Sequence, residues 1–78
     1  EKNECDFVVQ RNGKVEELVQ VCWELDSDNE KREVDGLVAA SKVTGCKNCK
    51  IVTFNQSMTL QSQDLQIMVV PAWELEEK

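Results

Sequence analysis

The stretch that decides the fold is CDFVVQRNGKVEELVQVCW, residues 5–23, in which two apolar-rich runs flank Asn12-Gly13. Asn-Gly is the preferred pair for a two-residue type I′ loop, because both central residues need positive φ. The stretch therefore predicts a β-hairpin. Counting outward from the loop gives three opposed pairs: Gln10 with Val15, Phe7 with Leu18, and Asp6 with Val19.

The second strand of this hairpin carries apolar residues on both of its faces. Val19 and Val21 alternate onto one face, whereas Leu18 falls on the other. A strand that is apolar on both sides is typical of the centre of a sheet covered from both directions. Trp23, at its end, is predicted to be a core or domain-docking aromatic, and so is Trp73.

A helix is predicted over about residues 28–44. Ser27 and Glu30 have the spacing of a capping box, and Gly45 supplies a left-handed stop. Apolar residues recur at helical spacing between these two signals. Glu30 and Glu33, in the first turns, are expected on an exposed face.

The rest of the chain predicts two further strands. Residues 49–54 form the third, and residues 65–70, stopped by Pro71, form the fourth. Residues 55–66 are polar and predict a loop or irregular hairpin in which Met58 and Leu60 pair weakly, while residues 72–78 would start another helix. A strand–helix–strand crossover implies a central parallel pair. We therefore expect one α/β domain, residues 1–78, with a mixed sheet of about four strands.

Composition limits the classes of function. The net charge of −6 disfavours the phosphate attraction that dominates nucleic-acid affinity, and Lys42, Lys47 and Lys50 are expected as solvated surface. The chain has no histidine, the commonest acid–base group at neutral pH. No run approaches the ~18 apolar residues of a membrane span, and no signal peptide opens the chain. We expect a soluble cytoplasmic domain without a membrane partner, cut from a longer protein because it begins at Glu1.

Four cysteines leave three possibilities open: two disulfides, a zinc site, or reduced thiols. Cys46 and Cys49 have the spacing of one zinc knuckle, but Cys5 and Cys22 form no second tight pair. Disulfides are disfavoured in a reducing compartment. Reduced, partly buried thiols are the expectation, with zinc as an alternative.

The order of elements is that of the metal-dependent nuclease core known as PD-(D/E)xK. In that core an Asp at the first strand and a Glu in the second hold Mg²⁺, which prefers oxygen ligands. A Lys two residues after the Glu lies on the same strand face and stabilises the charged transition state. Here Asp6 matches the Asp, while Gln20 and Cys22 occupy the Glu and Lys positions.

The chain also resembles the C-terminal nuclease-like domain of unknown function that follows the ATPase module in prokaryotic AAA-type ATPases. The motifs that carry this resemblance are ECDFVV at 4–9, GKV at 13–15, LVQVCW at 18–23, AASK at 39–42, GC at 45–46 and VVPAW at 69–73. The similarity covers about residues 3–73. It implies a restriction-endonuclease-like core, a parent chain that binds ATP in a part not included here, and the parent ATPase module as a partner.

The second motif departs from the family pattern, in which many members read Glu-Val-Lys. Gln20 offers Mg²⁺ only a neutral carbonyl oxygen, and Cys22 cannot replace a lysine ammonium. The resemblance thus implies a non-catalytic accessory or docking domain with a protein or DNA partner. The alternative is a divergent Mg²⁺-dependent DNA nuclease in which Asp6, Glu4 and Gln20 hold the metal and Lys42 reaches the site.

Overall fold

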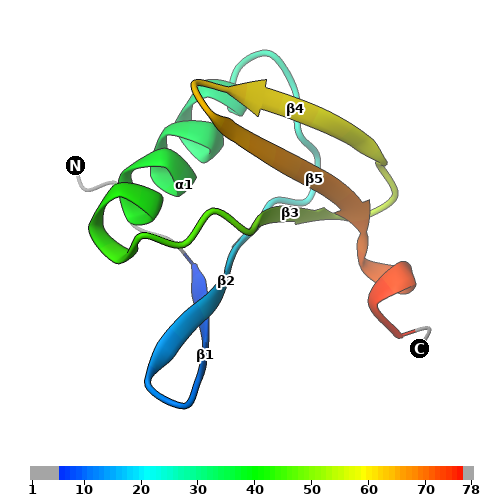
Figure 1. The fold of residues 1–78 in the computed structure, drawn as a ribbon. Coiled ribbons are helices and arrows are strands. Elements are labelled where there is room, and N and C mark those ends of the chain that lie inside the picture. The colour runs from blue at the N-terminus through cyan, green and yellow to red at the C-terminus, as the bar shows by residue number, and fades with distance from the viewer. Residues whose placement is uncertain (1–5, 77–78) are drawn as a thin grey trace.

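A computed structural model describes residues 6–76 and has an α/β fold with a mixed sheet and one α-helix (Figure 1). The elements are β1 (Phe7–Arg11), β2 (Lys14–Val21), α1 (Glu30–Thr44), β3 (Cys49–Thr53), β4 (Met58–Ser62), β5 (Leu65–Pro71) and the short 3₁₀ helix η1 (Ala72–Glu76). The five strands lie in the order β1-β2-β3-β5-β4. β2, β3 and β5 are parallel, and each edge strand is antiparallel to its neighbour. The predicted α/β class and the central parallel pair are confirmed.

The N-terminal hairpin forms at the predicted loop. Asn12 and Gly13 have φ angles of 56° and 80°, as a type I′ loop requires. Gln10 lies opposite Val15 as expected, but the register then shifts at a β-bulge. The extra residue on β2 places Phe7 opposite Val19 and not opposite Leu18, so the outer pairs of the prediction are wrong by one residue.

Helix α1 ends as predicted and begins differently. Gly45 has φ 81° and donates its N–H to the carbonyl of Ser41, at 2.7 Å. At the start, the N-cap is Asn29 and its side chain makes no cap bond. Instead, Asp26 Oδ1 accepts the backbone N–H groups of Asp28 and Asn29, at 2.9 and 3.0 Å. The expected capping box at Ser27 is therefore replaced by a turn held by Asp26.

The polar stretch after β3 is more ordered than the sequence predicts. β4 pairs with β5 along its whole length, through a tight turn at Gln63-Asp64. Gln63 has φ 55°, a conformation that non-glycine residues adopt rarely. Because a glutamine and not a glycine holds this position, the sequence gives no turn signal here. The expectation of a loop or weakly paired hairpin is corrected to a regular edge strand.

The core lies between α1 and one side of the sheet. Its fully buried side chains include Leu18, Leu37, Ile51, Ile67 and Val69. These strand residues align across the sheet, since Leu18 pairs with Cys49, and Cys49 with Ile67. Among residues 6–76, no helix is both long and apolar enough to cross a membrane.

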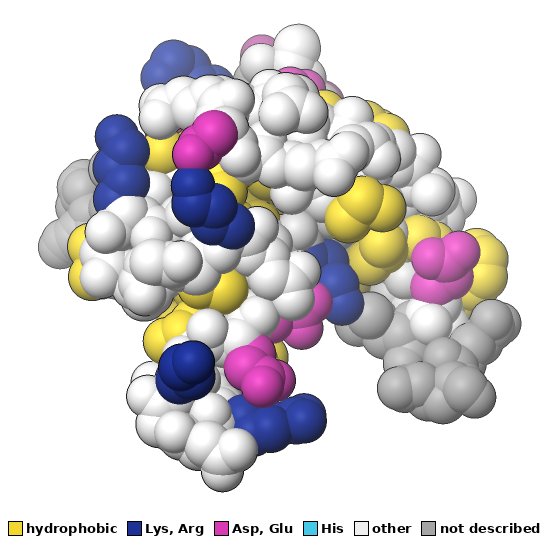
Figure 2. Space-filling view, viewed as in Figure 1, with side chains coloured by type: hydrophobic (Ala, Val, Ile, Leu, Met, Phe, Trp, Pro, Cys, Tyr) yellow, Lys and Arg dark blue, Asp and Glu magenta, His cyan; other side chains and the backbone are white. Residues whose placement is uncertain are grey.

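The other side of the sheet has no α-helix packed against it in the described chain (Figure 1). We call this side the open face. Its exposed apolar side chains are Phe7 (58%), Val9 (39%), Val21 (49%), Trp23 (72%), Phe54 (52%) and Met68 (46%). In the view of Figure 2, hydrophobic side chains reach the surface where β5 ends and near η1, whereas charged side chains lie over α1 and the hairpin. The expectation that β2 is covered on both sides is thus wrong for residues 6–76.

Candidate functional site

Asp6 and Gln20, two of the predicted motif residues, lie together where β1 begins and β2 nears its end. Gln20 is only 4% exposed and lies on the side of β2 that faces α1. Asp6 directly precedes β1 and is exposed. The hairpin brings them together because Phe7, the first residue of β1, pairs with Val19.

Two hydrogen bonds join Asp6 to the end of β2, one to Gln20 and one to Val21. The backbone N–H of Asp6 donates to Gln20 Oε1, at 2.8 Å. The backbone N–H of Val21 donates to Asp6 Oδ2, at 2.9 Å. The third contact is made by Gln20 Nε2, which donates to the main-chain carbonyl of Glu33, at 3.3 Å. Gln20 therefore ties the start of β1 and helix α1 to β2, and we call these three bonds the Gln20 clasp.

The clasp involves one oxygen atom of each of the two described side chains that were predicted to bind a metal ion. Gln20 Oε1 and Asp6 Oδ2 already accept backbone N–H groups. Within residues 6–76, no group of three His, Cys, Asp or Glu side chains is arranged to hold a metal ion. Glu4, the third predicted ligand, lies outside the described residues.

Cys22, at the lysine position of the motif, is held by the turn that precedes α1. Its Sγ donates to the carbonyl of Glu24, at 3.2 Å, and accepts from Asn29 Nδ2, at 3.5 Å. Burial raises the pKa of the Cys22 thiol, and the carboxylate of Glu33 raises it further. The side chain is thus a neutral thiol at pH 7 and cannot supply the positive charge of the missing lysine.

We expect the alkylation of Cys22 by iodoacetamide to be slow at neutral pH, with a pH midpoint above the ordinary thiol value of 9.0. Since the folded state holds this proton more tightly than the unfolded state, the free energy of unfolding should fall as pH rises through that range. Peptide mass spectrometry would follow Cys22 alone. The matched control is the chain in denaturant; equal midpoints in the two states would contradict the assignment.

Glu33 was missed by sequence reasoning. The residue was expected on an exposed helix face, yet its side chain is only 13% exposed and its carbonyl belongs to the Gln20 clasp. The acidic residues of the first turn do not indicate which side of α1 packs on β2.

Lys42, the proposed substitute lysine, is nine residues further along α1 than Glu33, about 13 Å along the axis at 1.5 Å per residue. The pKa of Asp64 is lowered mainly by its hydrogen bond to Lys47, and the positive charge of Lys42 lowers it slightly further. Lys42 therefore lies near Asp64, at the end of α1 away from the Gln20 clasp.

The remaining side chains singled out in the sequence are a lysine and the cysteines. Lys50 pairs with Glu17 at 2.8 Å, both about three-quarters buried, so neither is a simple solvated charge. Cys22 and Cys46 are free thiols, Cys49 is buried, and Cys5 lies outside the described residues. The zinc alternative depends on Cys5 and is not built by the described thiols.

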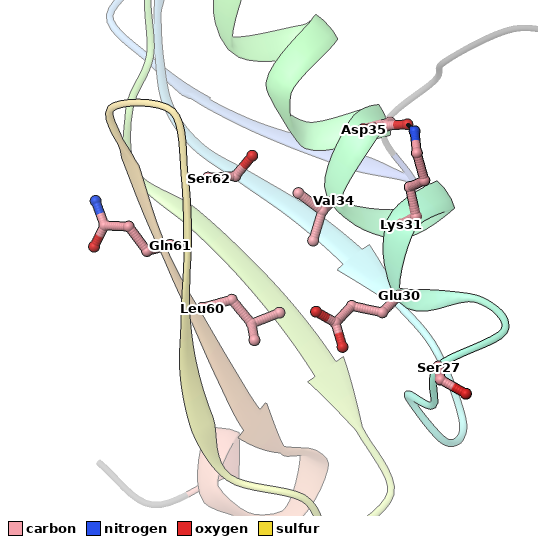
Figure 3. A pocket seen from close by; sticks show the side chains of 8 residues that line it. All are labelled: Ser27, Glu30, Lys31, Val34, Asp35, Leu60, Gln61 and Ser62. Atoms are coloured by element: carbon pink, nitrogen blue, oxygen red, sulfur yellow. Dashed lines mark hydrogen bonds and ion pairs between the residues drawn. The ribbon is translucent and has the colours of Figure 1, made fainter.

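A separate hollow of about 570 Å³ lies between α1 and β4. Figure 3 shows Leu60, Val34 and Glu30 directed toward this gap, while Lys31 and Asp35 pair with each other on the outer side of the helix at 2.7 Å. None of the motif residues lines it. Of the two carboxylates that line the hollow, Asp35 is paired with Lys31 and Glu30 is directed inward beside apolar side chains, so the lining offers no convergent set of catalytic groups.

At the ends of β2 and β3, Trp23 and Phe54 form an aromatic pair. Their ring centroids are 4.5 Å apart with 21° between the planes. The backbone N–H of Phe54 donates to the carbonyl of Trp23, at 3.0 Å, so the strand ladder fixes the pair. Trp23 is neither a core residue nor covered by another described element, and Trp73 is also more than half exposed. The core interpretation of both tryptophans is wrong.

Comparisons with known proteins show a similarity to an uncharacterized archaeal protein. No protein-family model matches the chain, and no solved structure matches it. The chain is similar to an uncharacterized protein of Methanocaldococcus jannaschii, with 34% identity over 76 residues that cover 90% of this chain. The chain spans 17% of the length of that protein.

Proposed function

We propose that this chain is a non-catalytic docking domain of a prokaryotic AAA-type ATPase, with a degenerate PD-(D/E)xK nuclease-like core. The observation that carries the proposal is the Gln20 clasp. The two motif side chains expected to bind Mg²⁺ instead bind backbone N–H groups and hold β1, β2 and α1 together. Positions that are catalytic in an active nuclease are structural here.

The relation to a nuclease-like core rests on the placement of the motif. Asp6 and Gln20 are adjacent across the hairpin, and Cys22 follows on the same side of β2 two residues later. A hairpin, a crossover helix and a parallel strand come in the expected order. The ATPase connection rests on the resemblance of the sequence motifs alone.

The docking role is supported by the open face. β1, β2 and β5 leave apolar side chains in contact with water on one side of the sheet, among them Phe7, Val21 and Met68. Parallel sheets are usually covered on both faces, and contiguous apolar patches on soluble domains mark interaction sites. The domain thus has a surface suited to binding another protein.

An NMR titration of the ¹⁵N-labelled domain with Mg²⁺ and Mn²⁺ tests the loss of catalysis. We expect no saturable shifts and no localised paramagnetic broadening at the amides of Asp6, Gln20 and Cys22. The matched control is the double variant Gln20→Glu/Cys22→Lys, which recreates the family motif and should broaden near Asp6 if it still folds.

Saturable broadening around Asp6 in the unmodified chain, with Mg²⁺-dependent cleavage of DNA that Asp6→Ala abolishes, would overturn the proposal in favour of the divergent nuclease. ATP added to the same sample should leave all amide shifts unchanged, because the sequence contains no phosphate-binding Gly-x-x-x-x-Gly-Lys-Ser/Thr motif.

A further inference from the structure

We infer that the open face binds an amphipathic helix of a partner protein, and that an arginine of this helix occupies a pocket formed by Trp23, Glu24 and Phe54. The inference rests on the proposed docking role and names the surface and the chemistry of the partner.

The open face has the dimensions of a helix-binding surface. The cross-strand row Phe7, Val19, Lys50 and Met68 runs over β1, β2, β3 and β5. Three strand spacings of about 4.8 Å give a width of about 14 Å, which accommodates one helix of about 10–12 Å diameter. In this row Phe7 and Met68 are 58% and 46% exposed and Val19 is half-buried. In the next row Val21 is 49% exposed, whereas Val52 is buried. The opposite side of the same sheet is already covered by α1, and helices on both faces are the usual arrangement of a largely parallel sheet.

A pocket of about 210 Å³ lies at the end of the face and is lined by Trp23, Glu24, Phe54, Asn55 and Gln56. It is smaller than the ~300–1,000 Å³ of pockets that hold whole small ligands. It therefore suits a single side chain.

The walls of this pocket are fixed before any partner binds. Gln56 Oε1 accepts from the N–H of Leu25 at 2.7 Å, and Gln56 Nε2 donates to the carbonyl of Leu25 at 2.9 Å. Thr53 Oγ1 also bonds to the backbone of Gln56. A pocket held by main-chain and amide hydrogen bonds loses little conformational entropy on binding.

The chemistry of the lining selects a cation. Trp23 exposes 72% of its surface although one ring face stacks on Phe54, and indole faces attract guanidinium groups. Glu24 is an exposed carboxylate in the same lining. Arginine is the side chain that stacks on aromatics and pairs with carboxylates in one geometry.

The charge in the pocket lining is negative, because Glu24 is the charged residue among the five that line it. In contrast, the ion pair of Glu17 with Lys50 leaves the centre of the open face neutral. A partner helix with an apolar stripe and arginine at one end is complementary to both parts. Arginine and aromatic residues are also the types enriched at protein–protein interfaces.

The test uses a synthetic helical peptide with Leu and Phe at i, i+3, i+4 and i+7 and Arg at the end of the stripe. A matched peptide carries citrulline, which has the shape of arginine without the charge. We expect the arginine peptide to shift amides of the open face and of Trp23 and Phe54 in NMR titrations. The citrulline peptide should bind about three- to tenfold more weakly, and added salt should reduce the difference.

Two variants with the same change in net charge locate the contact. Glu24→Gln should weaken binding of the arginine peptide about threefold or more, whereas Asp35→Asn, on α1 at the opposite side of the sheet, should leave it unchanged. Trp23→Ala should remove the preference for arginine over citrulline. Equal binding of the two peptides, shifts confined to other surfaces, or a dimer in sedimentation equilibrium that protects the open face would each overturn the inference.

This outcome is separable from that of the proposed function. A metal site at Asp6 would overturn the non-catalytic assignment and leave the peptide result intact. If the peptide does not bind and the metal titration gives no shifts, the open face is not a helix-binding surface and the non-catalytic assignment stands.

Discussion

Gln20→Ala should lower the free energy of unfolding by about 2–3 kcal/mol and reduce the Tm by about 10–20 °C. Gln20 is 4% exposed, and its amide makes two of the three bonds of the clasp. Removal of the side chain leaves the Asp6 N–H without this acceptor, leaves a cavity against α1, and unties the start of β1. Because a domain of this size has a total stability of only about 4–12 kcal/mol, the loss is a large fraction.

The control is Gln66→Ala, which removes the same side chain from an exposed position on β5. It should change the free energy of unfolding by no more than about 0.5 kcal/mol. Thermal and urea unfolding, followed by circular dichroism, would measure both variants. A Gln20→Ala protein as stable as the Gln66→Ala protein would mean that the clasp does not contribute to folding, and the structural role given to the motif would be lost.

The parts of the fold that the sequence predicts correctly are those set by local backbone chemistry. The Asn12-Gly13 loop and the Gly45 stop both depend on positive φ, and glycine and asparagine adopt it at low cost. The parallel arrangement of β2 and β3 follows from the helix between them, since a crossover connection requires it. These features need no knowledge of the rest of the chain.

The errors arise where tertiary contacts override a local signal. A bulge at Glu16 changes the register of the hairpin, and no residue of the loop announces it. β4 forms because β5 offers a paired edge, although its own residues are largely polar. The true start of α1 depends on Asp26, whose carboxylate reaches the backbone of the next turn better than Ser27 does.

The sequence predicted where the candidate site lies, but it did not predict the hydrogen bonds that its side chains make. The motif order placed Asp6 and Gln20 together, and the structure brings them within hydrogen-bonding distance. That Gln20 uses both ends of its amide depends on the path of α1 past β2, which sets the Glu33 carbonyl beside it. The Trp23–Phe54 pair joins residues 31 positions apart and required the parallel register of β2 and β3.

Replacement by alanine should lower the free energy of unfolding much more at Ile67 than at its neighbour on β5, Met68. Ile67 is 0% exposed and points into the core, whereas Met68 is 46% exposed on the open face. Ile67→Ala removes packed methylene groups and leaves a cavity, at a cost of about 2–5 kcal/mol in the free energy of unfolding. Met68→Ala should cost the isolated domain less than about 1 kcal/mol, because its side chain is already half in water.

The same pair separates folding from binding. Met68→Ala should weaken binding of the arginine peptide, while the unfolding midpoint in urea stays near that of the unmodified chain. A loss above about 2 kcal/mol for Met68→Ala would show that its side chain is packed in the isolated domain, which contradicts an uncovered face. Because consecutive strand residues point to opposite sides, one position along β5 is enough to move a side chain from the core to the surface offered to a partner.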